Sequence, residues 1–159
     1  AKHGGTYTAS AVGEVNVVAA MKANNAIIGG EGNGGIILPE SHYGRDALVG
    51  IALFLSLLAE KQMSVSSLKK TYPLYFMSKK KIDLNPSLDV DALLSAMEKS
   101  YQNETLTTVD GVKIDFIDSW VHLRKSNTEP IIRIYTEAPS QAQADALADR
   151  FISELKAFS

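Results

Sequence analysis

The sequence predicts an α/β unit followed by an α+β unit with a mostly antiparallel sheet and two helices. In residues 1–62, helical periodicity alternates with short branched apolar runs around a glycine-rich turn. In residues 72–159, two amphipathic helical patterns accompany several runs of alternating apolar and polar residues. The polar stretch at 63–71 separates the two patterns, and we expect the boundary there.

The composition limits the classes of partner. The 159 residues are 45% hydrophobic and 21% charged, as is typical of a soluble globular protein. A net charge of −2 gives no general attraction to nucleic acid or to anionic membranes. The most apolar run, 47–59, is shorter than the roughly 20 residues that span a bilayer. The absence of cysteine excludes disulfides and thiolate chemistry, and it fits a cytoplasmic location.

The first unit contains helix, strand, glycine turn, strand and helix in that order. Residues 12–25 predict a helix, 26–28 a buried strand and 35–40 a second strand. The predicted face of the first helix consists of Val15, Val18, Ala19 and Lys22. Asp46 can cap a second helix over 47–60. Because this helix is apolar nearly all round, we expect it to be buried against a sheet.

The second unit begins with a strand within 75–84, followed by a helix capped by Asp89. The apolar stripe of that helix is Val90, Leu93, Leu94 and Met97. Two alternating runs then flank Asp110-Gly111, a pair favoured in two-residue hairpin turns because both positions need positive φ.

The chain closes with two further strands and a long helix. Strands are predicted over 118–124 and 131–138, and the polar loop 125–130 interrupts them. The last helix starts with a capping box, Ser140 to Gln143. Its apolar stripe is Ala144, Leu147, Ala148, Phe151, Ile152 and Leu155.

The glycine stretch 29–35, GGEGNGG, satisfies G-x-G-x-x-G at Gly30, Gly32 and Gly35. A dinucleotide turn must open directly into a helix whose N-terminus carries the pyrophosphate. Here a branched run follows and no helix can start before about Gly44, so a nicotinamide-dependent oxidoreductase is rejected. Glu31 and Asn33 suit hydroxylated ligands instead, since they offer carboxylate and amide groups. A plain glycine-rich connection remains the alternative.

The loop RKSNTEP at 124–130 groups a guanidinium with hydroxyl and amide side chains: Arg124, Ser126, Asn127 and Thr128. Such a set can cradle phosphate, because guanidinium has a planar fork of donors that matches phosphate oxygens. Glu129 is expected to order the loop by accepting hydrogen bonds. An ordinary polar turn is the alternative.

Other candidate residues predict no chemistry. His3, His42 and His122 lack metal-ligand spacing, so no metal site is expected. His122 is interpreted as a structural residue of an alternating strand, and Trp120 as a core residue.

The order VGE…GGEGNGG…GRDALVGIALFLSLLAE…DGVKIDF…W…RKSNTEP…RIYTEA resembles the C-terminal half of the α-D-phosphohexomutases, the phosphoglucomutase/phosphomannomutase family. The resemblance implies that 1–62 are the later part of that family's α/β domain three. It also implies a linker at 63–71 and, at 72–159, a domain four with a TATA-box-binding-protein-like fold. Glu31 and Asn33 would then bind sugar, and Gly35 stands where many members have histidine. Arg124, Ser126, Asn127 and Thr128 would bind the non-reacting phosphate.

The resemblance also implies what lies elsewhere. Members transfer phosphate through a phosphoserine loop and a Mg²⁺ loop in their first two domains, and neither motif occurs here. With no initial methionine, the chain is expected to be part of a longer enzyme. No catalytic or metal-binding residue is therefore assigned. The expected partners are a phosphosugar and the N-terminal domains, and the expected cofactors are Mg²⁺ and a hexose bisphosphate activator. The reaction implied is the interconversion of hexose 1-phosphate and 6-phosphate, on glucose, mannose or glucosamine. A non-catalytic phosphosugar-binding module is the alternative.

Overall fold

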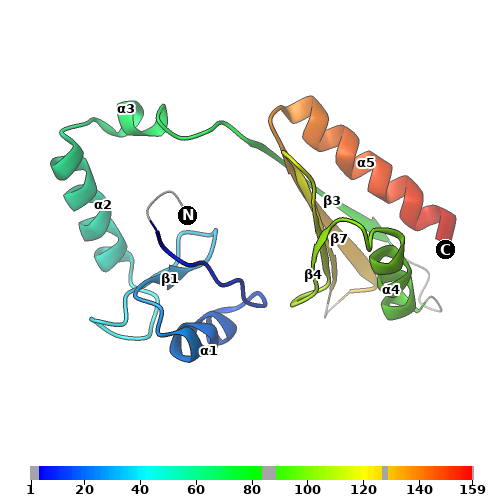
Figure 1. The fold of residues 1–159 in the computed structure, drawn as a ribbon, viewed down its shortest axis with the longest axis horizontal. Coiled ribbons are helices and arrows are strands. Elements are labelled where there is room, and N and C mark those ends of the chain that lie inside the picture. Colours follow the sequence, from blue (N-terminus) through cyan, green and yellow to red (C-terminus); the bar gives the residue numbers. More distant parts are fainter. Residues whose placement is uncertain (1–3, 84–88, 127–128, 159) are drawn as a thin grey trace. The chain divides into compact units, whose positions relative to one another are not determined.

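The computed structural model describes residues 4–83, 89–126 and 129–158. The chain folds as two compact units, Ala1–Pro73 and Leu74–Ser159 (Figure 1). Within the described residues, no helix is both long enough and apolar enough to cross a membrane.

The first unit contains a two-stranded antiparallel pair and three helices. Its elements are α1 (Glu14–Asn24), β1 (Gly29–Gly30), β2 (Ile36–Ile37), α2 (Ala47–Lys61) and α3 (Val65–Lys69). In the pair, Gly29 lies opposite Ile37 and Gly30 opposite Ile36. The predicted strand at 26–28 is therefore wrong in position, because the pairing falls on the glycines that follow it. Helix α3 lies within the stretch that the sequence predicted to be a linker.

The buried face of helix α1 overlaps only in part with the predicted one: of the predicted residues, Val18 packs against the buried cluster. Val17 and Met21 are buried with Ile37, whereas Val15 is 82% exposed. The reason is Gly29: a β-carbon there would lie 2.2 Å from Met21 Sδ. The side chain of Met21 occupies the space that this glycine leaves open, and this contact fixes the rotation of α1.

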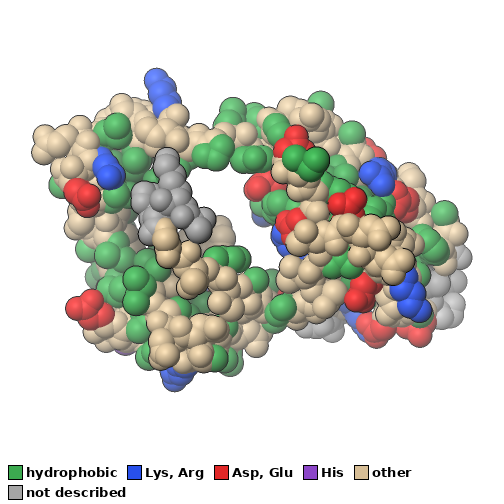
Figure 2. All heavy atoms as spheres, in the orientation of Figure 1, with side chains coloured by type: hydrophobic (Ala, Val, Ile, Leu, Met, Phe, Trp, Pro, Cys, Tyr) green, Lys and Arg blue, Asp and Glu red, His purple; other side chains and the backbone are tan. Residues whose placement is uncertain are grey.

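Helix α2 is not buried, so the prediction of a sheet-covered helix is wrong for this chain. None of its residues is buried, and Leu48 is 77% exposed. Figure 2 shows apolar side chains at the surface over this part of the chain. The strands β1 and β2 are too short to cover a 15-residue helix, and α2 meets them chiefly where Gly50 faces the side chain of Ile36. The predicted cap is confirmed: Asp46 accepts hydrogen bonds from the backbone N–H groups of Leu48 and Val49.

The second unit is an antiparallel sheet with helices on one side (Figure 1). Its strands pair in the order β3-β7-β6-β5-β4, and every pairing is antiparallel. The elements are β3 (Phe76–Asp83), α4 (Val90–Ser100), β4 (Thr105–Thr107), β5 (Val112–Asp115), β6 (Trp120–Lys125), β7 (Ile131–Ala138) and α5 (Gln141–Phe158). The α+β prediction for this part of the chain is confirmed.

One hydrophobic core joins the sheet to both helices. The strands contribute alternate residues, such as Val121 and Leu123 of β6 and Ile132 and Ile134 of β7. The predicted stripes of α4 and α5 pack against them; their buried members are Leu93, Leu94, Met97, Ala144, Ala148, Phe151 and Leu155. The alternation in the strands and the helical periodicity of α4 and α5 therefore predicted this core from the sequence.

Tyr101, which follows α4, ties that helix to α5. Its hydroxyl donates to Glu154 Oε2 at 2.7 Å and accepts from Arg150 NH2 at 2.7 Å. Its ring packs on Phe151, with ring centroids 5.1 Å apart. Burial, followed by the hydrogen bond to Glu154, raises the pKa of Tyr101 to about 12.

Two predictions for the second unit need correction. The hairpin exists, but Gly111 has positive φ and Asp110 does not, so the turn is not the predicted two-residue type. Thr107 pairs with Lys113, so the connection between β4 and β5 is longer than two residues. This connection runs alongside β6, where Gly111 lies against Leu123. Trp120 is half-buried and is not part of the core. It lies on the face of the sheet away from the helices, where its Nε1 donates to Glu137 at 3.1 Å.

Candidate functional site

The glycine pattern closes a hairpin. Glu31 N donates to Gly35 O at 3.0 Å, and Gly34 N donates to Glu31 O at 3.1 Å. The chain then enters β2, and the next helix begins only at Ala47. The loop therefore has no helix N-terminus to receive a pyrophosphate, in agreement with the rejection of a dinucleotide site.

The two polar side chains of this hairpin differ in burial. Glu31 is half-buried, and its Oε1 accepts from the backbone N–H of Gly13 at 3.3 Å. Its Oε2 accepts no hydrogen bond from the part of the chain that the structure describes. Asn33 is exposed, and its Oδ1 accepts from Gly35 N at 3.0 Å. Among the described residues, Glu31 Oε2 and the amide nitrogen of Asn33 thus make no hydrogen bond, which leaves the hairpin one acceptor and one donor group.

Arg45 braces the hairpin from the loop before α2. Its Nε donates to Glu14 Oε2 at 2.7 Å, and its backbone N–H donates to Glu14 Oε1 at 3.2 Å. Its side chain lies against Gly35, where a β-carbon would come within 2.8 Å of Arg45 Cδ. The motifs VGE and GRD contain these residues, but periodicity and turn rules assigned no role to either.

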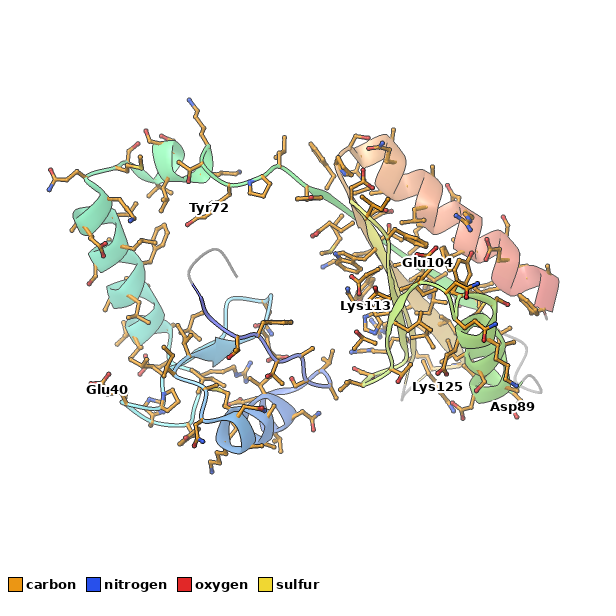
Figure 3. The ribbon with its side chains drawn as sticks, in the orientation of Figure 1. Glu40, Tyr72, Asp89, Glu104, Lys113 and Lys125 are labelled. Carbon is orange, nitrogen blue, oxygen red and sulfur yellow. The ribbon has the colours of Figure 1, made fainter. Side chains whose placement is uncertain are left out.

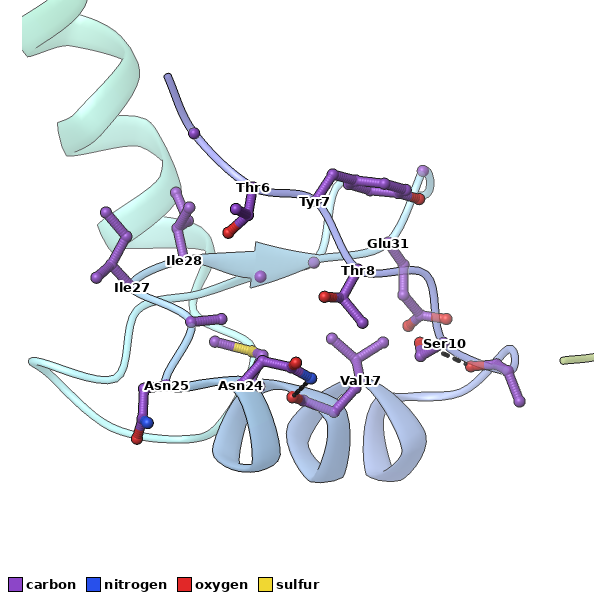
Figure 4. A pocket seen from close by; sticks show the side chains of 18 of the residues that line it. Thr6, Tyr7, Thr8, Ser10, Val17, Asn24, Asn25, Ile27, Ile28 and Glu31 are labelled. Atoms are coloured by element: carbon purple, nitrogen blue, oxygen red, sulfur yellow. Dashed lines mark hydrogen bonds between the residues drawn. The ribbon is translucent and has the colours of Figure 1, made fainter. Parts of the chain in front are cut away.

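A hollow of about 850 Å³ lies between the N-terminal segment, α1 and the hairpin (Figure 4). Its polar lining includes Thr8, Ser10 and Glu31, and its apolar lining includes Val17 and Ile28. Figure 4 shows the side chains of Thr8, Ser10 and Glu31 on the same side of this hollow. A surface that combines hydroxyl, carboxylate and apolar groups is suited to binding a sugar ring.

The second predicted loop follows β6. Arg124 is half-buried near the end of the strand, and Ser126 is buried with its backbone N–H donating to Ile131 O at 3.0 Å. Asn127 and Thr128 lie outside the described residues. The backbone carbonyl of Glu129 accepts from Ile131 N at 2.8 Å. The expected ordering of the loop by the Glu129 carboxylate stays a prediction, because this contact involves the backbone alone. The structure therefore places Arg124 and Ser126 at one end of the sheet.

Two charged neighbours of Arg124 went unnoticed in the sequence. Asp110 Oδ2 lies 3.5 Å from Arg124 NH1, and Arg133 lies directly opposite Arg124 on β7. Arg133 in turn faces Glu129 at 4.0 Å. The opposition of Arg124 and Arg133 follows from the register of β6 and β7, and the contact with Asp110 follows from how the turn before β5 lies against β6; local sequence pattern specifies neither.

Among the described residues, no three His, Asp or Glu side chains gather as a metal site would require. His42 contacts Asp46 at 3.1 Å, and His122 Nε2 donates to the Asp110 carbonyl at 2.5 Å. The hydrogen bond from Val49 N–H, and then that from His42, lowers the pKa of Asp46. Both histidines thus have structural partners, and His3 lies outside the described residues.

The family follows from comparison with known proteins. Residues 1–75 match the model for phosphoglucomutase/phosphomannomutase, alpha/beta/alpha domain III. Residues 79–154 match the model for the phosphoglucomutase/phosphomannomutase C-terminal domain. The chain belongs to the phosphoglucomutase/phosphomannomutase family.

Individual relatives agree. The chain is 38% identical to a phosphoglucosamine/phosphogalactosamine mutase of Sulfurisphaera tokodaii, over 91% of this chain and 31% of the relative. It is 36% identical to a phosphoglucomutase/phosphomannomutase of Thermococcus kodakarensis, over 90% and 31%. A crystal structure of a phosphoglucomutase/phosphomannomutase family protein from Burkholderia thailandensis superposes with a TM-score of 0.71 and 26% identity, covering 92% of this chain and 31% of that one. The chain thus spans about a third of the length of the relatives it matches.

Proposed function

We propose that this chain supplies the sugar-binding and phosphate-binding part of a phosphohexomutase that interconverts hexose 1-phosphate and hexose 6-phosphate. Glucose and mannose are the proposed sugars. The observation that carries the proposal is the match of both units to consecutive domains of one family, with a polar ligand loop in each unit. We further propose 1–62 as the sugar-binding domain segment, 63–71 as the linker and 72–159 as the phosphate-binding domain.

The proposed roles divide between the two loops. Arg124 and Ser126, with Asn127 and Thr128, bind the phosphate that does not react. Burial and the bond to Ile131 fix the backbone at Ser126, and the Arg124 fork can engage two phosphate oxygens. In the first unit, Glu31 and Asn33 bind the sugar, Glu31 through the carboxylate oxygen that Gly13 does not occupy.

The proposed reaction needs these residues to hold the substrate. A phosphoserine outside this chain transfers its phosphoryl group to the free hydroxyl of the sugar, which gives a bisphosphate. The bisphosphate then reorients and returns its other phosphoryl group to the serine. Such transfers depend chiefly on positioning and on charge stabilisation. The described residues of this chain do not form a site for the Mg²⁺ of the family, so no step runs through a metal held here.

A turnover assay tests the proposal. The full-length protein that contains this chain, supplied with Mg²⁺ and hexose bisphosphate, should isomerise glucose 1-phosphate or mannose 1-phosphate. Glucosamine 1-phosphate is assayed in parallel, because a preference for it would make the protein a phosphoglucosamine mutase. The isolated 159-residue chain should show no turnover under the same conditions. Turnover by the isolated chain, or none by the full-length protein, would contradict the proposal.

A further inference from the structure

The end of the sheet beside the phosphate loop brings two arginines together. Arg124 on β6 lies directly opposite Arg133 on β7. Like charges at directly opposed positions of an antiparallel pair repel each other. Each guanidinium has a carboxylate from a different loop nearby: Glu129 lies 4.0 Å from Arg133, and Asp110 lies 3.5 Å from Arg124. Asp110 is the only one of these four residues outside β6, β7 and their connection.

Asp110 is itself held against β6 by backbone contacts. Its carbonyl accepts from His122 Nε2 at 2.5 Å, two positions before Arg124 on the same face of the strand. The next residue, Gly111, has φ +74°, and a β-carbon there would lie 2.2 Å from Leu123 O. Only glycine allows the turn to lie this close to the strand. The turn between β4 and β5 is thus fixed directly beside Arg124.

We propose that Asp110 is a positioning residue for phosphate binding: it holds the Arg124 guanidinium in the orientation that receives the phosphate. The inference rests on the proposed function, in which Arg124 binds phosphate. A free arginine side chain has several rotatable bonds, and ordering it reduces the affinity of any site that uses it. The contact from Asp110 engages NH1 and leaves Nε and NH2, which form one edge of the fork, for phosphate oxygens. In this arrangement Gly111 and His122 hold Asp110 against β6, and Asp110 holds Arg124.

Competition between Asp110 and phosphate for Arg124 would have the opposite effect on phosphosugar binding. A carboxylate beside an arginine lowers the positive potential, so Asp110 could instead compete with phosphate for Arg124. In that case removing the charge would strengthen phosphosugar binding. The sign of the effect of Asp110→Asn therefore decides between positioning and competition.

The experiment uses four variants of the full-length protein: Asp110→Asn, Arg124→Ala, the double variant and Asp115→Asn. Steady-state rates give KM and kcat for the phosphosugar that is turned over, and inorganic phosphate serves as a competing anion. Asp115→Asn is the matched control: this carboxylate pairs with Lys113 on the same face of the sheet and does not contact Arg124 (Figure 3 shows Lys113). Thermal unfolding of each variant checks that the second unit still folds.

Asp110→Asn is expected to raise KM and the inhibition constant of phosphate about fivefold or more, with kcat nearly unchanged, because the contact acts on binding in the ground and transition states alike. In the Arg124→Ala background it should change neither value. Three results would overturn the inference while leaving the phosphate site in place. Asp110→Asn could have the same effect with and without Arg124, it could tighten phosphate binding, or Asp115→Asn could have an equal effect. Unchanged kinetics of Arg124→Ala would instead overturn the proposed phosphate site, and the inference with it.

Discussion

Replacement of Glu31 by glutamine is expected to weaken sugar binding without disturbing the hairpin. The hairpin is closed by backbone hydrogen bonds between Glu31 and Gly35 and between Gly34 and Glu31, which do not involve the side chain. Glutamine keeps one carbonyl oxygen that can still accept from Gly13 N. Its amide nitrogen then stands where the second carboxylate oxygen was, and a donor replaces an acceptor toward the sugar.

The magnitude follows from the loss of one charged hydrogen bond. Hydrogen bonds to charged groups contribute about 1.5–3 kcal/mol, which corresponds to roughly 10- to 150-fold in kcat/KM. Glu31 is half-buried, so solvent screens it in part and the lower end of this range is expected. A mutase holds the sugar in two orientations. If the carboxylate contacts hydroxyls in both, its loss should slow label exchange between the bisphosphate and each monophosphate by similar factors. The values of kcat/KM in the two net directions must change together in any case, because the equilibrium constant is unchanged.

The assay measures kcat/KM of the full-length protein from the 1-phosphate and from the 6-phosphate, together with label exchange between the bisphosphate and each monophosphate. Glu40→Gln is the matched control, since Glu40 is exposed on the loop after β2 (Figure 3) and should change neither rate. A loss in one direction of label exchange alone would mean that Glu31 serves a single orientation. No loss in either direction would refute the sugar-binding role of the hairpin.

Two other substitutions test the second unit. Arg124→Lys keeps the charge but loses the planar fork, so kcat/KM should fall clearly toward that of Arg124→Ala; parental kinetics would show that charge alone matters. Tyr101→Phe removes the hydroxyl between Glu154 and Arg150 and should lower the free energy of unfolding by about 1 kcal/mol in denaturant titrations at neutral pH. The pKa of Tyr101 is raised to about 12, so the folded state keeps a proton that the unfolded chain loses near pH 10. The stability advantage of the parent should therefore fall between pH 10 and 12, and a constant difference would refute this.

The second unit could be predicted from local pattern because its elements are amphipathic. In α4 and α5, each apolar stripe covers one face, and period-two alternation in β6 and β7 does the same for the sheet. The interpretation of Trp120 as a core residue was wrong, because the alternation along β6 places it with His122 on the other face of the sheet. Here alternation was the better guide than hydrophobicity.

The first unit was harder to predict because its packing depends on backbone details. The face of α1 is selected by the side chain of Met21 fitting against Gly29, which no helical period reveals. Helix α2 is apolar on every side, so its sequence indicates burial but not what covers it. An apolar helix is buried only if another element covers it. The two-residue strands β1 and β2 do not cover α2.

The two loops proposed to bind ligand have one feature in common: their side chains could be singled out in the sequence, but the residues that support them could not. Glu31 and Arg124 stand in compact motifs, but each is held by a residue far along the chain: Gly13 through its backbone N–H, and Asp110 through its carboxylate. In both cases the support lies at the edge of a different element, so it is brought into place only when the unit folds. The geometry of each proposed binding loop is therefore a property of that unit's tertiary structure. If the proposed roles hold, a substitution at either support should weaken binding even though the binding motif itself is intact.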